Sequence, residues 1–134
     1  MKRAATIVTW LLQVLLFMVM MGPGVQKFTS PVWERMFRAW GYPDHFYLVI
    51  GAIEVLAGLG LLVPRLASAS ALTLMTVMAG AAVTQMMNGR SGVGELVFLT
   101  LLGCVAYSRW PGILARLLAR RHAAGAHPSP VARV

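Results

Sequence analysis

Four long apolar runs constrain the fold of this chain more than any other feature. They cover residues 4–21, 46–63, 66–87 and 93–107. The first three reach the roughly 18–20 residues that a membrane-spanning helix needs, and the fourth does so if it extends through "SRWPG". Turn-forming sequences separate the runs: "MGPG", "VPR" and "NGRSGVG". We therefore predict an all-α fold, a transmembrane four-helix bundle.

The composition supports a membrane location. Of the 134 residues 58% are hydrophobic and only 12% are charged, whereas soluble domains carry about 25% charged residues. We expect one transmembrane domain at residues 1–112 and a basic cytoplasmic tail at 113–134. The net charge of +8 does not indicate nucleic-acid binding, because the basic residues flank apolar runs and form no patch with interleaved aromatics.

The basic residues are distributed unequally between the two sides that four spans would create. One side would hold four of them, namely Lys27, Arg35, Arg38 and Arg90. The other would hold the remaining eight: Lys2, Arg3, Arg65, Arg109, Arg116, Arg120, Arg121 and Arg133. The positive-inside rule then predicts a multi-pass protein of the cell membrane with both termini in the cytoplasm.

A short amphipathic helix is predicted between the first two spans, in "TSPVWERMFRAWGYP". Ser30 is the expected N-cap, Pro31 takes the first helical position, and Gly41 follows the end. One face would carry Val32, Trp33, Met36, Phe37 and Trp40. Such a helix lies in the membrane interface. It serves either as an anchor or as a lid over a pocket that opens from the outer leaflet.

Glu54 is the most informative residue, because it lies near the middle of the second apolar run. A carboxylate at that depth costs roughly 2.5–3.5 kcal/mol, and a neutral side chain would provide polarity at lower cost. At helical spacing it shares a stripe with Tyr47, Gly51 and Gly58. We favour a proton-handling role for Glu54. A structural ion pair or an assembly contact is the alternative.

Lys27, about one turn beyond the first span, is the expected cation for Glu54. These two residues are the candidate catalytic pair. The candidate ligand-binding residues are Gln13, Trp40, His45, Tyr47, Gly51, Gly58, Thr84, Gln85 and Tyr107. His45 has a second interpretation, as a polar cap at the outer end of its span.

Each span also shows a face of small and hydroxylated residues, which we expect to point inward. These faces comprise Thr6, Thr9, Gln13 and Met20 in the first span, Thr73, Thr76, Gly80, Thr84 and Met87 in the third, and Thr100, Gly103 and Tyr107 in the fourth. Threonine and glycine stripes of this kind commonly mediate helix packing in membranes.

The cysteine and histidine counts limit the cofactors. A single cysteine, Cys104, excludes an intrachain disulfide and a paired-thiol redox centre. The chain contains no Fe–S or flavin motif. His45 is the only histidine near the bundle, so one chain alone would not hold a bis-histidine haem. We expect no metal role for His122 or His127. A quinone remains possible as a cofactor.

Several stretches together resemble the DoxX-like family of small four-helix membrane proteins. They are "GPGVQKF", "WERMFRAWGYPDHF", "GAIEVLAGLGLLVPR" and "MAGAAVTQ", and the resemblance covers roughly residues 5–110. It implies that Lys27 and Glu54 match the family's recurring lysine and glutamate. Many relatives have a histidine in the third span, where this chain has Thr84 and Gln85. Some relatives look like membrane subunits of quinone-linked oxidoreductases, including thiosulfate:quinone oxidoreductase and terminal quinol oxidase.

Three functions remain open. The first, which we favour, is a quinone- or lipophilic-ligand-binding subunit of a membrane oxidoreductase. The second is an enzyme that isomerises a lipophilic molecule or opens an epoxide, with Glu54 as acid or base. The third is a non-catalytic assembly subunit. The expected partners are membrane lipid and either further copies of the chain or a redox subunit.

Overall fold

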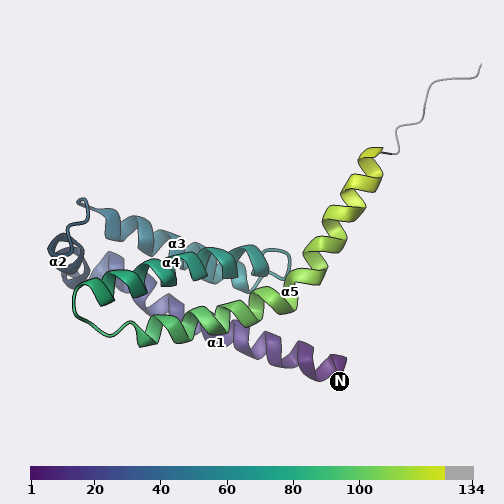
Figure 1. Ribbon diagram of the computed structural model, residues 1–134, viewed down its shortest axis with the longest axis horizontal. Coiled ribbons are helices and arrows are strands. Elements are labelled where there is room, and N and C mark those ends of the chain that lie inside the picture. Colours follow the sequence, from purple (N-terminus) through teal and green to yellow (C-terminus); the bar gives the residue numbers. More distant parts are fainter. Residues whose placement is uncertain (126–134) are drawn as a thin grey trace, which may run out of the picture.

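The computed structural model describes residues 1–125, and all of its regular elements are helices (Figure 1). In chain order they are α1 (Lys2–Thr29), α2 (Pro31–Ala39), α3 (Phe46–Leu61), α4 (Ala67–Met87) and α5 (Val93–Gly125). The all-α prediction is therefore confirmed for this part of the chain. The predicted starts at residues 46 and 93 and the predicted end at residue 87 coincide with the observed ones.

Four helices share one apolar core. α1 packs against α3, α3 against α4, α4 against α5, and α5 against α1. Each contributes one fully buried leucine: Leu16, Leu61, Leu74 and Leu102. The outward surfaces are also apolar, as on α1, where Ile7, Val8, Leu11, Leu15 and Met18 are exposed. A lipid environment accounts for such a surface.

Within residues 1–125, three helices, α1, α4 and α5, are long and apolar enough to cross a membrane. α3 is apolar but has only 16 residues. At 1.5 Å per residue it is about 24 Å long, shorter than the hydrocarbon core of about 30 Å. The structure therefore supports a helical membrane protein, and it leaves the span predicted at residues 46–63 unconfirmed.

The prediction that "MGPG" ends the first helix is wrong. α1 continues through Gly22, Pro23 and Gly24 to Thr29. Water is absent from the bilayer core, so a broken helix would leave more backbone groups without partners than one proline does. α5 likewise continues through Pro111, as expected if the last span extends through "SRWPG".

The inward faces were predicted only in part. Gly51, Glu54 and Gly58 are buried on α3, and Gln13 and Met20 are buried on α1. On α4, however, Thr73 and Thr76 are exposed, and the packed face consists of Ser68, Ala71, Leu74, Met78 and Ala82. The threonine hydroxyls donate to carbonyls of their own helix, Thr73 to Ala69 and Thr76 to Leu72. They therefore have no need of an interior partner.

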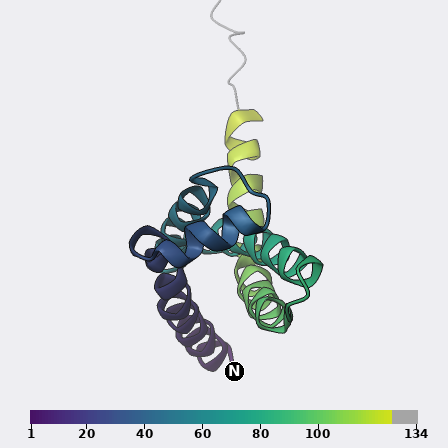
Figure 2. The same cartoon turned by 90° about the vertical axis from the view of Figure 1, so that its left-hand side faces the viewer.

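The predicted amphipathic helix is confirmed as α2. The Ser30 hydroxyl caps it by accepting a hydrogen bond from the Val32 N–H. α2 lies crosswise over one end of the four packed helices (Figure 2). The opposite end of the molecule carries the N-terminus and the long extension of α5 (Figure 1). In that extension the ring of His122 contacts the Leu118 carbonyl, whereas His127 and Arg133 lie outside the described residues.

Candidate functional site

A buried ion pair joins α1 to α3. Lys27 Nζ lies 2.6 Å from Glu54 Oε2, and each residue is only 4% exposed. Lys27 also lies over the ring of Trp33, 4.2 Å from its centroid, so the ammonium gains a cation–π contact. The pairing predicted between Lys27 and Glu54 is confirmed.

Two glycines allow α1 and α3 to approach closely beside this pair. A Cβ atom on Gly51 would lie 2.9 Å from Lys27 Cβ and 3.1 Å from the Gly24 carbonyl oxygen. A Cβ atom on Gly24 would lie 3.1 Å from Val55 Cγ2. Residue 51 therefore has to be glycine for the Lys27 stem to pass α3 at this distance.

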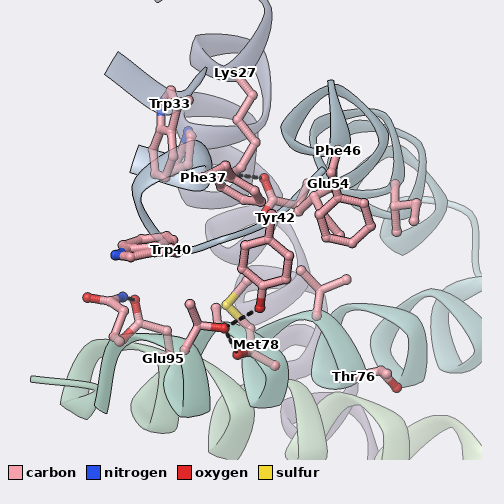
Figure 3. A pocket seen from close by; sticks show the side chains of 18 of the residues that line it. Lys27, Trp33, Phe37, Trp40, Tyr42, Phe46, Glu54, Thr76, Met78 and Glu95 are labelled. Carbon is pink, nitrogen blue, oxygen red and sulfur yellow. Dashed lines mark hydrogen bonds and ion pairs between the residues drawn. The ribbon is translucent and has the colours of Figure 1, made fainter. Parts of the chain in front are cut away.

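The ion pair faces an apolar cavity of about 460 Å³ beneath α2. Figure 3 shows the cavity with aromatic side chains from α2, the following loop and the start of α3 around it. They form a cluster, hereafter the aromatic cluster: Trp33, Phe37, Trp40, Tyr42 and Phe46. Phe37 is the centre of this cluster, with its ring 5.4–6.5 Å from the other four. The remaining walls come from α1, α3, α4 and the start of α5.

Two further polar pairs line the cavity on the side of α4 and α5. The Tyr42 hydroxyl lies 2.6 Å from Thr84 Oγ1. The Gln85 amide donates a hydrogen bond to Glu95 Oε1. The cavity thus combines a large apolar surface with a few polar groups, the usual composition of a small-molecule site.

Of the candidate catalytic and ligand-binding residues, the structure brings five to the cavity: Lys27, Glu54, Trp40, Thr84 and Gln85. Thr76 and Gly80, which were predicted only to face inward, line it too. Tyr47 contacts Phe37 from outside the cavity lining. Gly51 and Gly58 are buried in helix packing. His45 is exposed at the start of α3, and Tyr107 is 84% exposed on α5.

Gln13 is also remote from the cavity. It is fully buried, donates to the Leu61 carbonyl at 2.5 Å and accepts from Arg109 Nη2 at 2.6 Å. Leu61 is the last residue of α3, so this contact lies at the end of α3 farther from α2. Gln13 joins three helices there.

Tyr42 and Glu95 line the cavity, but neither was predicted as a site residue. Tyr42 lies in the loop after α2, where no periodicity indicates a direction. Glu95 lies near the start of the fourth apolar run, and nothing in the sequence indicated that it turns toward Gln85. Trp33 and Phe37 were detectable, because both lie on the predicted apolar face of α2.

The family comparison agrees with this architecture. A model of the DoxX-like family matches residues 11–108. The chain belongs to the DoxX-like family. The matched range includes the ion pair, the aromatic cluster and Glu95, so the whole cavity lies in the family domain. No curated protein and no solved structure matches the chain.

Proposed function

We propose that this DoxX-like protein binds a lipophilic ring compound of the quinone class in the cavity beneath α2, as a subunit of a membrane oxidoreductase. The observation that carries the proposal is the buried Lys27–Glu54 pair on the wall of an apolar, aromatic-lined cavity. The cavity size is within the range of about 300–1,000 Å³ that is usual for ligand sites.

The proposal includes an arrangement in the membrane. α1, α3, α4 and α5 cross the bilayer as a four-helix bundle, with local thinning to accommodate the short α3. α2 then lies in the interface, and both termini are cytoplasmic because the eight basic residues of the N-terminus, the α3–α4 turn and α5 with its tail share that side. A ligand dissolved in the bilayer reaches the cavity beneath α2.

The two charged groups suit the two oxidation states of such a ring. The Lys27 ammonium has three N–H donors and can donate to a quinone carbonyl. The Glu54 carboxylate can accept a hydrogen bond, and then the proton, from a quinol hydroxyl. Reduction of a quinone takes up two electrons and two protons. Glu54 would exchange one of the protons, bulk water at the membrane interface would exchange the other, and a partner redox subunit would exchange the two electrons.

Binding can be measured by tryptophan fluorescence, because Trp33 and Trp40 both line the cavity and quinones quench indole emission. We expect saturable quenching when a short-chain 1,4-benzoquinone is added to the protein in lipid nanodiscs. Lys27→Gln should weaken the affinity about tenfold, equivalent to about 1.4 kcal/mol. Lys2→Gln, an exposed lysine near the N-terminus, is the matched control and should change nothing.

Glu54→Gln provides a second variant, since it keeps the size and hydrogen-bonding capacity of the side chain while removing ionisation. It should fold and bind the ring but lose proton-coupled activity in the membrane complex. Non-saturable quenching in the unmodified protein would refute the proposal. So would an equal loss of affinity in the Lys27 and Lys2 variants.

A second function, acid–base catalysis on a lipophilic substrate, is favoured by one observation. Four groups that can exchange protons line the cavity: Lys27, Tyr42, Glu54 and Glu95. An enzyme that opens an epoxide needs such groups around the reacting atoms. Turnover of a lipophilic epoxide by the isolated chain, abolished in Glu54→Gln, would establish this function in place of the first.

A further inference from the structure

The polar groups of the cavity fall into two sets on different walls. Lys27 and Glu54 come from α1 and α3, whereas Thr84, Gln85 and Glu95 come from α4 and α5. Figure 3 shows Glu95 on the other side of the cavity from Lys27 and Glu54, with the ring of Tyr42 between them. A ligand bound at the ion pair would therefore have a second polar group within the same cavity.

The direction of the Tyr42–Thr84 hydrogen bond follows from its neighbour. Thr84 Oγ1 lies 2.9 Å from the Gly80 carbonyl oxygen, which can only accept. The single hydroxyl proton of Thr84 is therefore used within α4. The 2.6 Å contact between Tyr42 and Thr84 then requires Tyr42 to donate. The Tyr42 oxygen is left as an acceptor, with its proton directed away from a ligand.

Glu95, like Tyr42, offers a hydrogen-bond acceptor to a ligand. An ionised carboxylate offers only acceptors, and Gln85 donates to one of its two oxygens. The second wall therefore presents acceptors from Tyr42 and from Glu95, and a ligand group that meets them has to be a donor.

We infer that Tyr42, Thr84 and Glu95 form a second binding subsite that selects a hydroxyl group on the ligand edge remote from Glu54. The inference rests on the proposed function and extends it. The preferred ligand is a flat lipophilic ring with hydroxyls on two opposite edges, a 1,4-hydroquinone. A phenol with one hydroxyl leaves the subsite without a partner, and a quinone presents it with a carbonyl acceptor.

The test compares three probes that carry the same short side chain: a 1,4-hydroquinone, the phenol that lacks its second hydroxyl, and the quinone. The titrations are anaerobic, so that the hydroquinone is not oxidised. Affinities are measured calorimetrically with the full chain in nanodiscs. We expect the hydroquinone to bind about tenfold more tightly than the phenol, the effect of one hydrogen bond to a buried acceptor. In Tyr42→Phe this ratio should fall, because only the Glu95 acceptor is left in the subsite.

Thr84→Val is the sharper variant, because it keeps the shape of Thr84 and removes the acceptor of the Tyr42 proton. Tyr42 can then donate into the cavity. The preference for quinone over hydroquinone should therefore rise by about fivefold to tenfold, a change of about 1–1.4 kcal/mol. If Thr84 served only in helix packing, Thr84→Val would bind the quinone and the hydroquinone more weakly to the same extent, and this preference would not change.

The outcomes separate this inference from the proposed function. If no ring probe binds the unmodified protein, the proposed function fails. If all three bind, but the hydroquinone and the phenol do so equally, only the subsite assignment is wrong. An unchanged quinone-to-hydroquinone preference in Thr84→Val would also overturn the assignment.

Discussion

Arg109 on α5 donates a 2.6 Å hydrogen bond to Gln13 on α1, 96 residues earlier in the chain. Gln13 in turn donates to the Leu61 carbonyl at the end of α3, and the Arg109 guanidinium lies 5.5 Å from the centroid of the Trp10 ring. One buried amide thus fixes three helices at the end of α3 farther from the cavity. Gln13 was a candidate ligand-binding residue, and this position indicates a structural role.

Replacing Gln13 should reduce stability and leave ligand binding unchanged. Gln13→Leu removes the partner of the Leu61 carbonyl and of Arg109 Nη2, so we expect a loss of about 1–3 kcal/mol in the free energy of unfolding. Thr9→Val is the control, because the Thr9 hydroxyl bonds to Ala5 within its own helix. Denaturation in detergent, with quinone affinity measured in parallel, tests this. A weaker affinity without a loss of stability would restore the ligand-binding hypothesis.

Replacing one partner of the Lys27–Glu54 ion pair should cost more stability than replacing both. Lys27→Met leaves the Glu54 carboxylate buried beside an apolar side chain, and we expect a loss of about 3–5 kcal/mol. The double variant Lys27→Met, Glu54→Leu removes both polar groups and should recover most of that stability. Thermal unfolding of the two variants provides the comparison. Equal destabilisation in both would show that the pair contributes net stability, contrary to our expectation.

Gly51→Ala should disturb the packing of α1 on α3. The new methyl group would overlap Lys27 Cβ, and overpacking of this kind costs about 1–3 kcal/mol. Gly22→Ala is a matched control within α1, because nothing lies within 4 Å of its Cβ position. The control should be neutral or stabilise the helix by up to about 1 kcal/mol. Similar unfolding temperatures for the two variants would contradict the close-contact explanation.

Trp40→Ala should weaken ligand binding by about tenfold, because it removes an aromatic wall of the cavity. Trp110→Ala serves as its control. Trp110 lies on α5, is 50% exposed and does not line the cavity. Calorimetric titration with a short-chain hydroquinone distinguishes the two variants. If both variants lose affinity to the same extent, the cavity is not the binding site.

Reporter fusions should place both termini in the cytoplasm. The prediction rests on the unequal distribution of basic residues and on an even number of crossings, which requires α3 to span. A reporter inserted in the loop after Met87 should give the opposite signal. Reporters that place the two termini on different sides would exclude α3 as a span, or would require another helix to be peripheral.

Much of the fold was predictable because its signals are local. Apolar runs predicted the helices, and Gly89, which adopts a positive φ angle of 68°, follows the end of α4 as the turn sequence indicated. The Lys27–Glu54 pair was predictable because an unpaired charge in a membrane is costly and few cations lay within reach. The amphipathic pattern of α2 likewise identified Trp33 and Phe37 on its apolar face.

Other features depend on how the helices rotate against one another, which no single periodicity determines. Thr73 and Thr76 both satisfy their hydroxyls on their own helix, yet Thr76 lines the cavity and Thr73 does not. Glu95 reaches the cavity only because α5 starts beside Gln85 of α4. Tyr42 reaches it through a loop whose direction is fixed by contacts with Phe37 and Phe46.

The close approach at Gly51 has a consequence for protein engineering. The residue that controls the position of Lys27 has no side chain and takes no part in any chemistry. A mutant library that varies only the charged and aromatic residues around the cavity would therefore leave the spacing of the two helices untouched. To change the distance between the charges of Lys27 and Glu54, an engineer would first replace Gly51 or Gly24 and then make compensating changes on the facing helix.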